Sequence, residues 1–198
     1  MKTFLLFIGF VPTIILQAQQ KPYYYNIPDT PTTYTAATVA ARLVDGLGFR
    51  YFWATEGLTE KDLNYKPSTD ARTTLQTLEH INGLVEILAN TVAKKSTTFG
   101  NPAEKLSFAQ LRDKTLKNIQ TASELLKKSD AKLEDLDMIF ERASNKTEFP
   151  FWNLINGPIS DALWHVGQVV SFRRGSGNPL PKGVNVLTGT KTGGGDGE

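Results

Sequence analysis

The sequence predicts an all-α fold: a four-helix bundle with an irregular segment between its third and fourth helices and a Gly- and Pro-rich C-terminal tail. Apolar residues recur at a spacing of about 3.6 in four separate segments, which is the period of an amphipathic helix. Gly or Pro interrupts the chain between these segments, and no convincing set of alternating strands is present. At 198 residues, the chain is long enough for one domain with its own core.

We expect the first two helices at about residues 34–57 and 71–95. The first carries Val39, Leu43 and Leu47 at helical spacing and ends near a glycine. The second has a longer apolar series, and Ser68, Thr69 or Asp70 is available to cap its start. Its apolar positions are Leu75, Leu78, Ile81, Leu84, Val85, Leu88 and Val92.

The third and fourth helices are expected at about residues 107–128 and 159–173, the fourth introduced by Gly157-Pro158. Residues 131–148 between them are irregular, with a short strand near 138–142. Apolar residues cover nearly every direction of the fourth helix, so we expect it to be buried on most sides. Beyond it, residues 179–190 carry Val184, Val186 and Leu187, which favours folding back onto the bundle; the last few residues are expected to be disordered.

The N-terminus has the pattern of a secretory signal peptide. A basic start at Met1-Lys2 precedes an uncharged run over residues 3–16, and Ala18 supplies the small residue before a cleavage point. The run is shorter than the about 20 residues that span a membrane. We therefore expect a signal peptide at 1–18, an extended lead-in at 19–33, the helical domain at 34–178 and an extension at 179–198. The mature protein is expected to be exported, periplasmic or secreted, without stable membrane insertion.

Composition excludes several classes of function. The chain contains no cysteine, so it has no disulfide, no thiolate nucleophile and no Cys-based zinc site. Its net charge of +2 is not gathered into a Lys/Arg-rich stripe, which argues against nucleic acid as a partner. We interpret the doublets Lys127-Lys128 and Arg173-Arg174 as helix-end charges that complement the helix dipole.

One carboxylate and two imidazoles form a candidate metal site. Asp161 and His165 are four residues apart in the fourth helix and so lie on one face of it, with Gln168 continuing the polar stripe. The other histidine of the chain, His80, lies in the apolar second helix. Two histidines and one carboxylate form a three-ligand set that leaves coordination positions open. The residues alone leave two readings: a metal site, or a structural pair in which Asp161 orients His165.

Three short segments resemble the DinB/YfiT-like superfamily of four-helix bundles. They are Tyr51-Phe52-Trp53-Ala54 with Leu58-Thr59-Glu60-Lys61-Asp62-Leu63, then Thr74-Leu75-Gln76-Thr77-Leu78-Glu79-His80-Ile81, then Asp161-Ala162-Leu163-Trp164-His165-Val166-Gly167-Gln168 with Arg173-Arg174. The family typically binds a divalent metal through one histidine of helix two and a His-x-x-x-His pair of the last helix. The resemblance thus implies ligands at His80 and His165, while Asp161 stands where the family has a histidine.

Two classes of function follow. The first is a metal-dependent hydrolase or transferase that uses a divalent transition metal, zinc, nickel or iron, on an unknown small-molecule substrate. The second is a non-catalytic binding or structural bundle with a vestigial metal site. Homodimer formation is a further expectation, and no general base is evident beside the three candidate ligands, because Gln168 cannot act as one and Glu79 is expected to face away.

Overall fold

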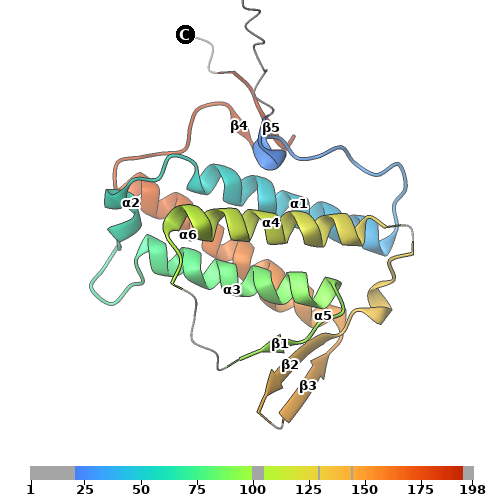
Figure 1. The fold of residues 1–198 in the computed structure, drawn as a ribbon. Coiled ribbons are helices and arrows are strands. Elements are labelled where there is room, and N and C mark those ends of the chain that lie inside the picture. The colour runs from blue at the N-terminus through green and yellow to red at the C-terminus, as the bar shows by residue number, and fades with distance from the viewer. Residues whose placement is uncertain (1–20, 100–104, 129, 144, 194–198) are drawn as a thin grey trace, which may run out of the picture.

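The computed structural model describes residues 21–99, 105–128, 130–143 and 145–193, and this part of the chain is mostly helical with small strands (Figure 1). Its long helices match the four segments predicted as helical, except that the last one continues to Gly175, beyond the predicted end at 173. They are α1 (Ala36–Thr55), α3 (Thr74–Val92), α4 (Phe108–Leu126) and α6 (Ser160–Gly175). The expected signal peptide, the first residues of the lead-in and the end of the C-terminal extension lie outside the described residues.

Short helical elements precede or connect the long helices. They are η1 (Tyr23–Tyr25), α2 (Glu60–Asn64), η2 (Leu133–Asp135), α5 (Phe151–Leu154) and the π-helical turn η3 (Ile155–Ile159). None of the described helices is long and apolar enough to cross a membrane.

Capping boxes fix where three of the long helices begin. Thr73 Oγ1 accepts from the backbone N–H of Gln76 at 3.2 Å, and the backbone N–H of Thr73 donates to Gln76 Oε1 at 2.9 Å. The same reciprocal pair starts α1 at Thr35 and α4 at Ser107. Each box satisfies two backbone donors that the first helical turn leaves unpaired. The predicted cap of the second helix at residues 68–70 was therefore wrong by a few positions.

The four long helices enclose the core. Helices α1 and α3 each pack against both α4 and α6, and their apolar faces form one cluster of buried side chains. Figure 1 shows α1, α3 and α4 running roughly alongside one another, with α6 crossing obliquely behind them. Helix α1 is the most deeply buried, and Leu47, Phe49 and Tyr51 in it have no exposed surface. This arrangement places α3 and α6 side by side, with one flank of each facing the other.

A small sheet lies at one end of the helices. It consists of β1 (Thr97–Thr98), β2 (Met138–Arg142) and β3 (Asn145–Phe149), with β2 central, parallel to β1 and antiparallel to β3. The predicted strand near 138–142 is confirmed. The sequence did not reveal β3, because its side chains are mostly exposed and carry no alternating apolar pattern. The structure therefore has two features besides the predicted helices: this three-stranded sheet and a pair of two-residue strands near the C-terminus.

We had expected Gly157-Pro158 to start a new helix. Instead it lies within a continuous helical path from α5 through η3 to α6. Proline lacks an N–H and disrupts a regular α-helix, and the π-helical turn accommodates it here. Ser160 Oγ donates to the carbonyl of Ile155 at 2.6 Å within this turn. Because this turn leads directly into α6, it sets the orientation of α6 and of the polar stripe that α6 carries.

The C-terminal extension folds back over α1, as the sequence predicted. Its strands β4 (Val184–Asn185) and β5 (Thr190–Lys191) pair with each other, and the N–H of Ile27 donates to the carbonyl of Gly189 at 2.7 Å. Gly189 has a φ of 69°, and a Cβ there would lie 2.5 Å from the Ile27 side chain, so this close approach requires glycine. The expected burial of Val186 and Leu187 was wrong, since they are 50% and 90% exposed.

Candidate metal centre

Helices α3 and α6 bring the three predicted ligands together. His80 Nε2 lies 3.2 Å from Asp161 Oδ2, and His165 Nε2 lies 3.3 Å from Asp161 Oδ1. The two imidazole rings are perpendicular, with centroids 4.6 Å apart. One ligand atom from each residue lies within 4.8 Å of the others, so these atoms form a compact group that could hold a metal ion. The predicted convergence of His80 with the other two residues is confirmed.

Gln168 orients the second imidazole. Its Oε1 lies 2.8 Å from His165 Nδ1, and because an amide oxygen accepts hydrogen bonds, this contact is a hydrogen bond when Nδ1 carries the proton. In a neutral imidazole the lone pair is then on Nε2, which faces Asp161 Oδ1. Two acceptors face each other unless a proton or another cation lies between them. Sequence reasoning placed Gln168 in the polar stripe but missed this role, which depends on side-chain direction.

The cluster lies at the surface of the α3–α6 seam. The side chains of His80 and Asp161 are 34% and 40% exposed, and that of His165 is 14% exposed. Water therefore reaches the carboxylate and one imidazole directly. Glu79, next to His80 on α3, is exposed and is not among the three clustered residues.

Charged groups buried elsewhere have protein partners instead. Asp62, 1% exposed, accepts hydrogen bonds from the backbone and side chain of Thr59 and from Ser176 and Asn178. Burial alone raises the pKa of Asp62, but these donors outweigh it and hold the pKa well below its usual range. Asp161, by contrast, has only the two imidazoles as partners within the described part of the chain.

Two basic residues lie at helix ends, as predicted, and have further partners. Lys127 caps α4 and pairs its Nζ with Oδ2 of buried Asp45 at 2.6 Å. Arg173 is 2% exposed, and its guanidinium donates to the carbonyls of Trp53 and Ala54. Burial lowers the pKa of Arg173, while Asp62 and Glu56 act in the opposite direction. Both predictions missed partners that are distant in sequence.

Neither a family model nor a curated protein or solved structure matches this chain.

Proposed function

We propose that the protein binds one divalent transition metal ion through His80, Asp161 and His165. The observation that carries the proposal is the convergence of one ligand atom from each of these residues within 4.8 Å, with His165 Nε2 3.3 Å from a carboxylate oxygen. Gln168 Oε1 lies 2.8 Å from the other ring nitrogen of this histidine, Nδ1. A metal-ligating histidine commonly donates its other ring N–H to an oxygen in this way. A bound cation relieves the repulsion between the lone pair and the carboxylate.

The spacing of the ligand atoms supports a shared ion. Ligands at about 2.0–2.2 Å from one zinc ion lie roughly 3–4 Å from one another. The two nitrogen–oxygen separations at Asp161, 3.2 and 3.3 Å, fall in this range. Two imidazoles and one carboxylate suit zinc, nickel or iron. The surface position of the cluster leaves room for a further ligand.

The reaction class that this site suits is metal-assisted hydrolysis or transfer on a small molecule. An ion held by three protein ligands acts as a Lewis acid on a molecule in its open position. The chain itself supplies the binding and the orientation: Asp161 balances charge, and Gln168 fixes the ring of His165. The fold in this proposal is an all-α, DinB-like four-helix bundle that carries a small sheet, and the protein is exported to the periplasm or beyond. The resemblance of the three sequence segments and the N-terminal pattern support these parts.

Elemental analysis of tag-free protein, followed by calorimetric titration with zinc and with nickel, tests metal binding. We expect one equivalent of ion. Asp161→Asn and His80→Gln should each weaken binding by a hundredfold or more, since each removes a ligand. Glu79→Gln removes an exposed carboxylate from the residue next to His80 and is the matched control, with unchanged affinity expected.

The outcome separates the two readings of the cluster. If Asp161→Asn binds the ion within a few-fold of the unaltered protein, Asp161 is only the partner that orients His165. If neither protein binds zinc or nickel, the cluster is a structural tie between α3 and α6, and the non-catalytic reading holds.

A further inference from the structure

A second candidate binding site lies on the other side of α6. A groove of about 440 Å³ runs between α1, α6 and the C-terminal extension. This volume is within the range of small-molecule sites, roughly 300–1,000 Å³. Its apolar wall consists of Trp53 from α1, Leu163, Val166 and Val170 from α6, and Leu180 and Val184 from the extension.

The charged residues that line this groove are all basic. Arg50 and Arg174 contribute to its wall, and none of the described lining residues is acidic. Arg50 Nη1 donates to the carbonyl of Gly46 at 3.0 Å, which leaves most of its five N–H donors for another acceptor. Within the described part of the chain, neither guanidinium pairs with a carboxylate. The groove therefore combines an apolar body with two cations that lack a counter-charge.

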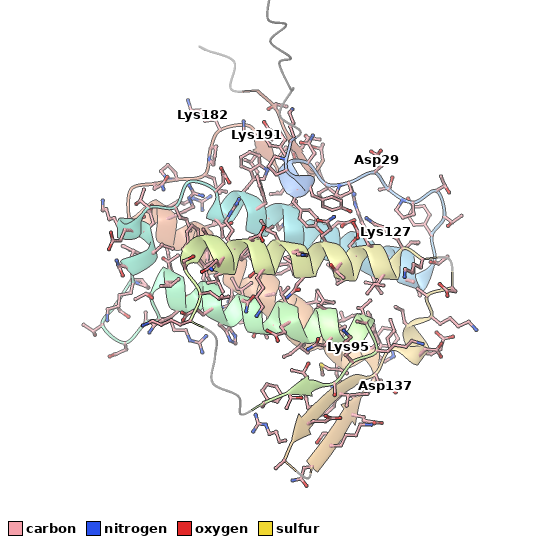
Figure 2. The ribbon with its side chains drawn as sticks, in the orientation of Figure 1. Asp29, Lys95, Lys127, Asp137, Lys182 and Lys191 are labelled. Atoms are coloured by element: carbon pink, nitrogen blue, oxygen red, sulfur yellow. The ribbon has the colours of Figure 1, made fainter. Side chains whose placement is uncertain are left out.

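The extension adds to this positive charge. Lys191 Nζ lies 5.8 Å from the centre of the Trp53 ring. Figure 2 shows Lys182 and Lys191 near the β4–β5 pairing, on the side of the molecule where the extension crosses α1. Hydrogen bonds hold the extension in place, with the N–H of Lys191 donating to Asn26 Oδ1 at 2.8 Å. The wall that the extension contributes is therefore anchored to the lead-in.

The groove is separate from the metal centre. A helix turns about 100° per residue, so Gly167 in the groove lies roughly 160° around α6 from His165. The flank of α6 that carries Asp161 and His165 faces α3, whereas the groove flank faces α1. A ligand in the groove does not reach the metal ligands, and its binding does not depend on a metal.

We propose that this groove binds a small amphipathic monocarboxylate, a free fatty acid of medium chain length. Its alkyl chain lies against Trp53 and the aliphatic side chains, where burial of apolar surface favours binding. Its carboxylate lies between Arg50 and Arg174, because guanidinium groups bind carboxylates through paired N–H donors.

Calorimetric titration of the lipid-extracted full chain with decanoate tests this proposal. We expect one decanoate per chain, and decanol, which has the same tail without the charge, should bind at least tenfold more weakly. Arg50→Gln and Arg174→Gln should each lower the affinity about tenfold, since each removes a charged hydrogen-bond donor. Arg72→Gln removes an exposed cation outside the groove and should have no effect.

Blocking variants locate the ligand. A Cβ at Gly167 meets no atom within 4 Å, and leucine favours a helix over glycine, so Gly167→Leu should fold and fill the groove. Gly83→Leu is the matched control, because Gly83 is an equally open glycine of α3. Loss of decanoate binding in Gly167→Leu alone supports the groove. Each of four results would overturn the proposal. The two variants bind decanoate equally, the unaltered protein binds decanol as tightly as decanoate, it does not bind decanoate at all, or a second copy of the chain occupies the groove in place of decanoate.

Discussion

Replacing Arg173 with methionine should strongly destabilise the fold. The guanidinium is 2% exposed and donates to the carbonyls of Trp53 and Ala54 at 2.8 and 3.1 Å. These carbonyls belong to the last turn of α1, where the helix itself provides no donors. Arg173 also donates to the backbone carbonyl of Asn178 at 2.7 Å and to its Oδ1 at 3.1 Å. One side chain therefore joins the end of α1, the end of α6 and the residue just before the extension.

The magnitude follows from the groups left without a donor. A hydrogen bond to a charged group contributes about 1.5–3 kcal/mol, and a buried carbonyl that loses its partner costs about 1–3 kcal/mol. Removing the guanidinium also removes the cost of burying a cation, which offsets part of the loss. We expect Arg173→Met to lower the free energy of unfolding by roughly 3–5 kcal/mol. Arg173→Lys should lose less than the methionine variant, because an ammonium keeps the charge without the planar fork of donors.

Urea denaturation followed by far-ultraviolet circular dichroism measures these differences. Arg174→Met is the control, since this neighbouring side chain is exposed and should change stability by about 0.5 kcal/mol or less. An Arg173→Met variant as stable as the Arg174→Met variant would refute the inference that the guanidinium joins the three segments.

Three further predictions concern other charged or polar groups. Asp62→Asn should destabilise the protein at neutral pH. Because the folded-state pKa of Asp62 lies below its unfolded value of about 3.9, the difference from the unaltered protein should shrink as the pH falls below about 4, which denaturation across pH would show. Lys127→Met should cost roughly 1.5–3 kcal/mol by leaving buried Asp45 without its cation, while exposed Lys128→Met should be near neutral in the same assay. Gln168→Leu should weaken zinc binding about 10- to 100-fold in calorimetry, because the imidazole it orients becomes free to turn or change tautomer; unchanged affinity would contradict that role.

The sequence predicts one part of the His80, Asp161 and His165 cluster and leaves the rest to helix packing. Asp161 and His165 were placed on one face of one helix by spacing alone, since i and i+4 always adjoin in an α-helix. That His80 meets them depends on how α3 packs against α6, which no local rule specifies. The sequence resemblance supplied this pairing as an expectation, and the distances in the structure confirm the convergence. The orientation of His165 by Gln168 depends on rotamers and became visible only in three dimensions.

The sequence by itself determined the four long helices, the strand at Met138–Arg142 and the pairing of Asp161 with His165 on one helix face, because periodicity and helical spacing are local properties of the chain. The tertiary structure decided which charges are buried. Arg173 and Lys127 lie at helix ends, as predicted, but they also bind groups of α1 that are distant in sequence. The tertiary structure also decided that the extension forms one wall of the apolar groove that Arg50 and Arg174 line, while Leu187 of the extension stays exposed. Burial depends on which surfaces meet, and that is fixed by the packing of the whole chain rather than by the composition of any one segment.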